Sequence, residues 1–281
     1  GVTAHAYLRW LQTQGERPTC DIAFGTDETG WLFQQRDLHS RRAPGNTCLA
    51  ALRAMKSLGE PARNDSKGCG GVMRVAPVGL FSWRLRQQDS PHDAFRLGAE
   101  LAALTHGHPT GALTGGVLAV LILALTDGAS LPEALVASKA ILRSEPGHEE
   151  TLRAIELAET LAASGQPHEA AISQLGQGWI AEEALAISIY CALVARNFKH
   201  GVILAVNHDG DSDSTGSITG NLLGAMHGVR AIPAEWLEPL ELREVITSLA
   251  EDLYAFKDWE IGEYSENAEM NQRIWQKYPG F

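Results

Sequence analysis

The sequence predicts an all-α fold in a single domain. Apolar residues recur at helical spacing over most of the chain, and the strict alternation that marks strands is nearly absent. No stretch rich in proline, glycine and serine divides the 281 residues, and no internal repeat is present beyond one glycine spacing. We therefore expect one helical bundle over residues 1–281.

The expected helices can be placed in order. The chain opens with a helical pattern at residues 1–11, and the further candidates are residues 46–58, 91–104, 110–125, 132–143, 149–163, 181–194, 214–229 and 240–256. The longest apolar run, residues 111–126, is short for a membrane span and contains Gly115 and Gly116. We expect it to be a buried helix of the core.

Composition narrows the class of protein. The chain is 44% hydrophobic and 20% charged, which is ordinary for a soluble globular protein long enough to bury a substantial core. A net charge of −11, with no block of lysine and arginine, argues against a nucleic-acid or membrane partner. The cysteines are far apart and form no C-x-x-C motif: Cys20, Cys48, Cys69 and Cys191. With no signal peptide, this favours a reducing cytoplasm and neither disulfides nor zinc.

Residues 207–216 are the most informative segment. They place Asp209, Asp211 and Asp213 within five positions, with hydroxyl residues such as Ser214 beside them. Small oxygen ligands at this spacing suit a hard divalent cation such as Mg²⁺. Acidic residues also favour a helix N-terminus, so a capped helix start without metal is the alternative.

Glycine recurs every fourth residue in the helix that follows, at Gly216, Gly220, Gly224 and Gly228. Glycine inside a helix costs about 1 kcal/mol relative to alanine, so four on one stripe need an offsetting gain. We expect that gain to be the close approach of a neighbouring backbone. Such packing would hold the acidic residues rigidly.

Two other acidic loops can be compared with this segment. An EF-hand loop starting at Asp209 fails, because Ser214 and Gly220 stand where it needs glycine and glutamate. The D-x-D-x-[TV] pattern of haloacid dehalogenase phosphatases matches residues 211–215. Its first aspartate should directly follow a strand, and strand signals are missing here. The phosphatase stays a weaker alternative.

Residues 64–74 form a second candidate segment. Ser66 and Lys67 precede Gly68, Gly70 and Gly71, which indicates a nest of N–H groups suited to phosphate or, alternatively, a plain turn before a helix. Arg74 could clamp a phosphate or pair with a carboxylate.

Two further segments have weaker signals. His106 lies where one long helix ends and another begins, so it could cap a helix or serve as a ligand. Thr26-Asp27-Glu28-Thr29 is acidic and hydroxyl-rich, and we expect a surface turn there.

Four motifs together carry a family resemblance. They are Ser66-Lys-Gly-Cys-Gly-Gly-Val-Met-Arg74, Thr105-His106, Gly176-Gln-Gly-Trp179 with Ala181-Glu-Glu-Ala-Leu185, and Gly210-Asp-Ser-Asp-Ser-Thr-Gly216. In this order they resemble the ADP-ribosylglycohydrolase family, which includes ADP-ribosylarginine hydrolases and the dinitrogenase reductase-activating glycohydrolase. The resemblance extends over roughly residues 5–255.

The resemblance implies a fold, an activity and a set of site residues. The family fold is an orthogonal all-α bundle that holds two Mg²⁺ or Mn²⁺ ions in a cleft, and its members remove ADP-ribose from modified proteins or related conjugates. By resemblance the metal ligands would be Asp211, Asp213 and Ser214. The residues along ADP-ribose would be Ser66, Lys67, Gly68, Cys69 and Gly70, with His106 near the adenosine end.

The sequence departs from the family pattern at its start. Members begin with a Gly-Asp-Ala segment and a Thr-Asp-Asp-Thr motif, which supply the remaining metal ligands and, nearby, the catalytic carboxylate. Both should precede residues 7–11, so no catalytic residue can be assigned here, and we interpret residues 26–29 as a coincidence. We expect an N-terminally incomplete hydrolase with weak metal binding and little activity; a non-catalytic ADP-ribose-binding or structural relative is the alternative.

Overall fold

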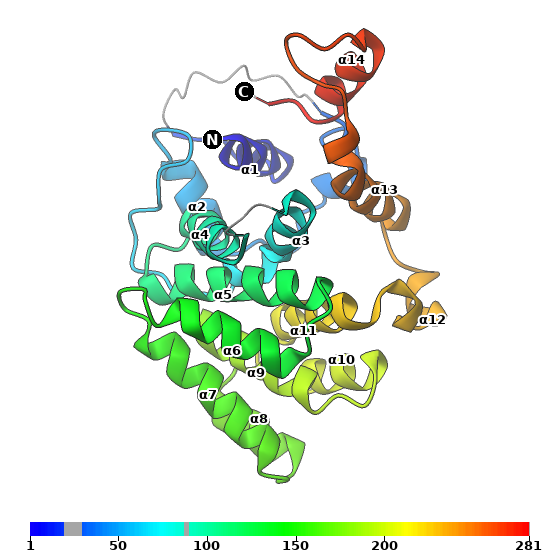
Figure 1. The fold of residues 1–281 in the computed structure, drawn as a ribbon. Helices are drawn as coiled ribbons and strands as arrows, with labels where there is room; N and C mark the ends of the chain where they lie inside the picture. The colour runs from blue at the N-terminus through cyan, green and yellow to red at the C-terminus, as the bar shows by residue number, and fades with distance from the viewer. Residues whose placement is uncertain (20–29, 87–89, 281) are drawn as a thin grey trace. The chain divides into compact units, whose positions relative to one another are not determined.

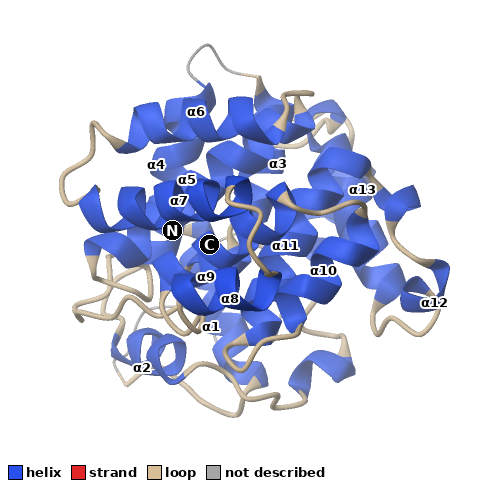
Figure 2. Cartoon of the chain, turned by 90° about the horizontal axis from the view of Figure 1, so that it is seen from below, coloured by secondary structure: helices blue, strands red, loops and turns tan. Residues whose placement is uncertain are grey.

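The computed structural model describes residues 1–19, 30–86 and 90–280. Over these residues every regular element is a helix, and only an isolated bridge between Gly68 and Ile180 has strand geometry (Figure 2). The prediction of an all-α fold is confirmed. The chain forms two compact units, Gly1–Arg63 with Leu242–Phe281, and Asn64–Glu241. A single domain over residues 1–281 stays a prediction.

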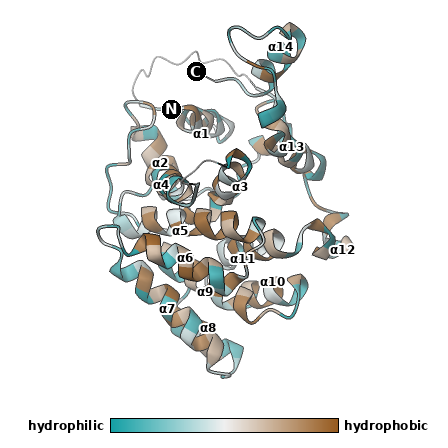
Figure 3. Cartoon of the chain, in the orientation of Figure 1, coloured by the Kyte–Doolittle hydropathy of each residue, from teal (hydrophilic) through white to brown (hydrophobic). Residues whose placement is uncertain are grey.

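The larger unit, Asn64–Glu241, is built around one helix. Helix α5 (Pro109–Thr126) packs against α3, α4, α6, α7, α9 and α11. Fourteen of its eighteen residues are buried, and Figure 3 shows it as one of the most hydrophobic helices of the chain. Its length and composition would suit a membrane span, but 78% of it is buried within the protein, as a core helix requires.

The other helices of this unit follow in chain order (Figure 1). They are η2 (Val72–Arg74), α3 (Ala76–Leu85), α4 (Ser90–Ala103), α6 (Leu131–Leu142), α7 (Glu149–Ala163), α8 (His168–Leu175), α9 (Ala181–Leu193), α10 (Phe198–Val206), α11 (Ser212–His227), η3 (Val229–Ala231) and α12 (Ala234–Leu237). Helix α4 approaches α5 so closely at Gly98 that there is no room for a side chain. A Cβ atom there would lie 2.6 Å from the carbonyl oxygen of Gly115.

The smaller unit contains the helices at the two ends of the chain. They are α1 (Val2–Thr13), η1 (Arg36–His39), α2 (Asn46–Ala54), α13 (Arg243–Ala255), η4 (Phe256–Asp258) and α14 (Ala268–Lys277). Its core is small: α13 has no fully buried residue and α14 only Ile274. Backbone contacts join its two sequence segments, since the Trp31 amide donates to the Lys277 carbonyl at 3.1 Å.

Each predicted helix is present, with one clear boundary error. The expected helix 46–58 ends at Ala54, because the backbone of Met55 turns extended, at ψ 129°, as its side chain becomes buried. Helices α3, α8, α10, α12 and α14 were not among the predicted helices.

The expected role of the glycine stripe on α11 is wrong for most of its members. A Cβ on Gly220 or Gly224 would meet no described atom within 4 Å, and Gly228 ends the helix with φ of 72°. Only Gly216 of the four is tightly packed, with its Cβ position 2.6 Å from Val206 Cγ1. The stripe therefore does not mark a continuous close approach of backbones.

Candidate functional site

Three loops of the larger unit meet through backbone hydrogen bonds. We call them the glycine loop (residues 66–71), the tryptophan loop (residues 176–180) and the aspartate loop (residues 207–214). The Cys69 amide donates to the Trp179 carbonyl at 3.2 Å. On the other side of the tryptophan loop, the Gln177 carbonyl accepts a hydrogen bond from the Asp211 amide at 2.7 Å. The tryptophan loop thus joins two segments about 140 residues apart in the chain.

Glycine makes this junction possible. A Cβ on Gly210 would lie 1.8 Å from the Gln177 oxygen, so only glycine allows that approach. Gly178 has φ of 81° and lies against Thr215. Glu183, in the first turn of α9, holds the tryptophan loop by accepting from the amides of Gln177 and Gly178 at 2.9 and 3.1 Å.

The aspartate loop directs Asp211 inward. Asp211 precedes the first residue of α11, and its side chain is buried against the glycine loop, where its Oδ2 accepts from the Cys69 thiol at 2.7 Å. Thr215 is fully buried and donates to the Ala205 carbonyl at 2.6 Å, which fixes the start of α11 against α10. Asp213 is exposed. The loop thus presents one buried and one exposed carboxylate.

The electrostatics of this pair suit a cation. Burial and the neighbouring Asp213 carboxylate raise the pKa of Asp211, while the contacts from Cys69 and Ser214 act in the opposite direction. Burial and the Asp211 carboxylate raise the pKa of the Cys69 thiol to about 12, so it stays a protonated donor. A divalent cation would relieve the repulsion between the two carboxylates, and carboxylate oxygen is the ligand that Mg²⁺ and Mn²⁺ prefer.

The ligand set is nonetheless small. No group of three or more histidine, cysteine, aspartate or glutamate side chains suited to a metal gathers among the residues that the structure describes. The hydroxyl of Ser214 donates toward two sulfur atoms, Met73 Sδ at 3.1 Å and Cys69 Sγ at 3.4 Å.

His106 lies at the centre of the glycine loop's packing. A Cβ on Gly68 or Gly71 would come within 3.3 Å of its imidazole, and its Nδ1 lies 2.8 Å from the Thr105 hydroxyl. Burial, with a smaller effect of the Arg74 charge, lowers the pKa of His106 to about 4. The imidazole is therefore neutral at pH 7 and packs beside the glycine loop.

Arg74 holds the loop's own framework. Its guanidinium donates to the Gly70 and Leu101 carbonyls at 3.0 and 3.2 Å and to the Thr105 hydroxyl at 2.6 Å. Within the described residues, the amides of Gly70 and Gly71 donate to no protein acceptor. Two N–H groups of the glycine loop are therefore without an acceptor among the described residues.

Lys67 has a different environment from the one expected beside a diphosphate. Its ammonium binds the carboxylates of Glu150 and Glu182. Burial alone would lower the pKa of Lys67, but the two hydrogen-bonded carboxylates outweigh the effect of burial, and the pKa is raised. The charge of Lys67 is thus already neutralised. Its backbone carbonyl accepts from the Ala181 amide at 2.8 Å and so joins the glycine loop to the start of α9.

Sequence reasoning missed the acidic residues that support the loops. Glu182 is buried, its Oε2 has no hydrogen-bond partner among the described residues, and burial raises its pKa. Glu182 and Glu183 belong to the Ala181–Leu185 motif, but they resemble ordinary first-turn acids of a helix, so no role was predicted for them. Residues 26–29 lie outside the described residues.

Comparisons with known proteins agree with these motifs. The family model for ADP-ribosylglycohydrolase matches residues 2–261. Human ADP-ribosylhydrolase ARH3 is 27% identical over 228 residues, covering 69% of this chain and 61% of ARH3. The ADP-ribosyl-[dinitrogen reductase] glycohydrolase of Rhodospirillum rubrum is 26% identical over 229 residues, covering 80% of this chain and 68% of that protein.

A solved structure confirms the fold type. A chain of an ADP-ribosylglycohydrolase-related protein complex superposes with a TM-score of 0.60 at 30% identity, covering 75% of this chain and 68% of that one. The chain spans about three fifths of the length of several curated relatives. No strand precedes Asp211 among the described residues, so the phosphatase alternative has no support. With its matching model, fold and loop motifs, the chain belongs to the ADP-ribosylglycohydrolase family.

Proposed function

We propose that the chain is a metal-dependent hydrolase that removes ADP-ribose from a modified protein side chain or a related conjugate. The observation that carries this is the contact between Cys69 Sγ and Asp211 Oδ2, at 2.7 Å. It brings the loop suited to a diphosphate and the loop suited to a divalent cation to one place. Family membership supports the reaction class, because relatives are ADP-ribosyl hydrolases by name.

In this proposal the glycine loop binds ADP-ribose. The amides of Gly70 and Gly71, which donate to no acceptor among the described residues, would donate to its diphosphate. Ser66, Lys67, Gly68, Cys69 and Gly70 lie along the diphosphate and ribose, and the buried neutral imidazole of His106 lies toward the adenosine. Lys67 acts by its backbone, since its ammonium is bound to Glu150 and Glu182.

The aspartate loop would hold Mg²⁺ or Mn²⁺. Asp211 and Asp213 supply carboxylates, and Ser214 supplies a hydroxyl, which donates its proton toward Met73 and Cys69. A bound ion of this kind polarises sugar hydroxyls and positions water. The backbone bond from Asp211 to Gln177 and the Cys69 thiol fix the Asp211 carboxylate in place beforehand. Because Mg²⁺ demands about six ligands, two carboxylates and a hydroxyl bind it weakly, and we expect slow hydrolysis by this chain.

Titration with Mn²⁺ by calorimetry tests the metal site. We expect weak binding to the unaltered chain, and a loss of about tenfold or more in Asp213→Ala, because a carboxylate ligand is gone. Asp209→Ala is the matched control: it removes the same charge from an exposed position in the same loop and should leave the affinity within a factor of two or so. Equal effects of the two substitutions would show general charge attraction and no site.

Release of ADP-ribose tests the reaction. ADP-ribosylated arginine and serine peptides are incubated with the chain and Mn²⁺, and free ADP-ribose is measured. We expect slow release that Asp211→Asn abolishes. A chain that binds ADP-ribose but releases none, even at high Mn²⁺, would be the non-catalytic relative.

A further inference from the structure

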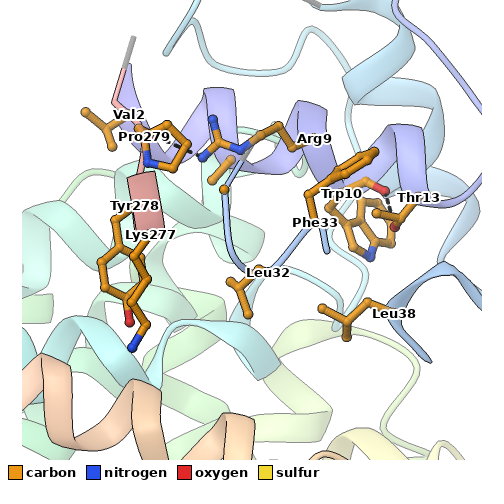
Figure 4. A pocket seen from close by; sticks show the side chains of 12 residues that line it. Val2, Arg9, Trp10, Thr13, Leu32, Phe33, Leu38, Lys277, Tyr278 and Pro279 are labelled. Atoms are coloured by element: carbon orange, nitrogen blue, oxygen red, sulfur yellow. Dashed lines mark hydrogen bonds between the residues drawn. The ribbon is translucent and has the colours of Figure 1, made fainter. Parts of the chain in front are cut away.

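A cavity of about 280 Å³ lies within the smaller unit, Gly1–Arg63 with Leu242–Phe281, and the proposed function makes no use of it. Its walls are mostly apolar. Figure 4 shows Trp10 and Phe33 at one end and Tyr278 at the other, with Leu32 and Leu38 across from helix α1. Engineered cavities of about 150 Å³ take up benzene, so this one has room for one ring or two fused rings.

Arg9 supplies positive charge on the α1 wall. Its Nη2 donates to the Pro279 carbonyl at 3.3 Å, and its Nη1 lies 2.9 Å from His5 Nδ1. It pairs with no carboxylate among the described residues. The other cation on the wall, Lys277, is already bound to Asp252. Arg9 is thus a half-buried guanidinium that meets no carboxylate in the part of the chain that the structure describes.

The hydrogen bonds around Arg9 are also mutually inconsistent. His5 Nδ1 lies 2.9 Å from Arg9 Nη1, which can only donate, and 2.9 Å from the Gly280 carbonyl oxygen, which can only accept. One imidazole nitrogen either accepts or donates, so one of these contacts is unsatisfied. An anion that accepted from Arg9 would free His5 Nδ1 to donate to Gly280.

We propose that this cavity binds a small aromatic carboxylate, with its ring between Trp10, Phe33 and Tyr278 and its carboxylate on Arg9. Aromatic walls favour a ring through stacked or edge-to-face contacts. The planar guanidinium matches a carboxylate through paired hydrogen bonds. Apolar walls around a guanidinium that is paired with no carboxylate among the described residues favour a ligand with one acidic group.

The test uses a matched pair of probes, indole-3-acetate and indole-3-acetamide, which differ in charge and little in shape. Binding of each to the whole chain is measured by calorimetry or ligand-observed NMR. We expect the acid to bind at least about tenfold more tightly than the amide, as one charge-assisted hydrogen bond allows. In Arg9→Gln the acid should lose that advantage while the amide is unaffected. Arg63→Gln, an exposed arginine of the same unit, should change neither.

A second variant tests the cavity itself. Ala6 lines it, and Ala6→Phe should fill it and abolish binding of both probes, with the thermal midpoint showing that the chain still folds. Equal binding of acid and amide to the unaltered chain overturns the proposal, whatever the variants do. So does undiminished binding in Ala6→Phe, or no binding of the acid at several millimolar.

Discussion

Two groups of glycines in the larger unit look alike in the sequence and differ in the structure. At the junction of the three loops, a Cβ on Gly210 would overlap the Gln177 carbonyl, and one on Gly111 would come within 3.1 Å of the Ser66 carbonyl oxygen. Along α11, a Cβ on Gly220 or Gly224 would have no atom of another described residue within 4 Å. Glycine is therefore required where backbones from distant segments cross, and regular spacing along one helix does not reveal such a crossing.

The difference also separates the functional part of the unit from its scaffold. The junction glycines let the glycine, tryptophan and aspartate loops reach hydrogen-bonding distance, and so they set the position of Asp211 beside Cys69. Gly220 and Gly224 weaken α11 without a packing contact in return. Substitutions in the two groups should therefore act in opposite directions.

The largest effect is expected for Gly210→Ala. The new methyl group cannot coexist with the Gln177 oxygen at 1.8 Å, so the bond from the Asp211 amide must break and the aspartate loop must move. We expect a loss of at least about 3 kcal/mol in the free energy of unfolding. Urea unfolding followed by circular dichroism measures it. A loss below about 1 kcal/mol would mean that the three loops do not meet in this way.

A second effect concerns the acid stability of the same junction. His106 is neutral when folded because burial lowers its pKa to about 4, whereas in the unfolded chain its pKa is near 6.5. Between these values the unfolded state binds more protons, so stability falls as pH drops from about 6.5 to 4 and is unaffected above. The full difference corresponds to about 3 kcal/mol.

Unfolding of His106→Gln at several pH values checks this expectation. The variant should lose stability less steeply between pH 6.5 and 4 than the unaltered chain, since it has no imidazole to protonate there. His227→Gln, an exposed histidine at the end of α11, should leave the slope unchanged. The same slope in all three chains would show that His106 is accessible to solvent.

The smallest effect is expected for Gly220→Ala. The methyl group enters open space on a helix, and alanine favours helix by about 1 kcal/mol over glycine, so the variant should be more stable by up to that amount. Thermal unfolding measures the change, and Gly224→Ala should repeat it. Destabilisation by either substitution would restore the original expectation that a backbone packs against the stripe.

Local patterns in the sequence predicted much of the fold. The helix at Glu149–Ala163 was placed to the residue, because acidic residues mark its start and its apolar period is regular. The buried helix α5 was recognised from its uninterrupted apolar run. The eight-residue α8 and the nine-residue α10 were missed, since they are too short for a clear period.

For the candidate site, sequence reasoning named residues and not the contacts between them. Asp211, Cys69 and His106 were singled out from local chemistry and family resemblance. No local pattern could show that Gln177 joins the loops, or that Glu150 and Glu182 neutralise Lys67, because these contacts link residues 34 to 115 positions apart. The same limit explains the error over α11: spacing identifies a helix face, but not what lies opposite it.

The central claim is that the glycine and aspartate loops form one site for ADP-ribose and a divalent cation. The direct test is calorimetric titration of ADP-ribose with and without saturating Mn²⁺, in the unaltered chain and in Asp213→Ala. Ligands that share a site influence each other's affinity, typically by about fivefold or more. We expect Mn²⁺ to tighten ADP-ribose binding by at least that factor in the unaltered chain and to have no effect in Asp213→Ala. An affinity for ADP-ribose that is the same with and without Mn²⁺ would contradict the account.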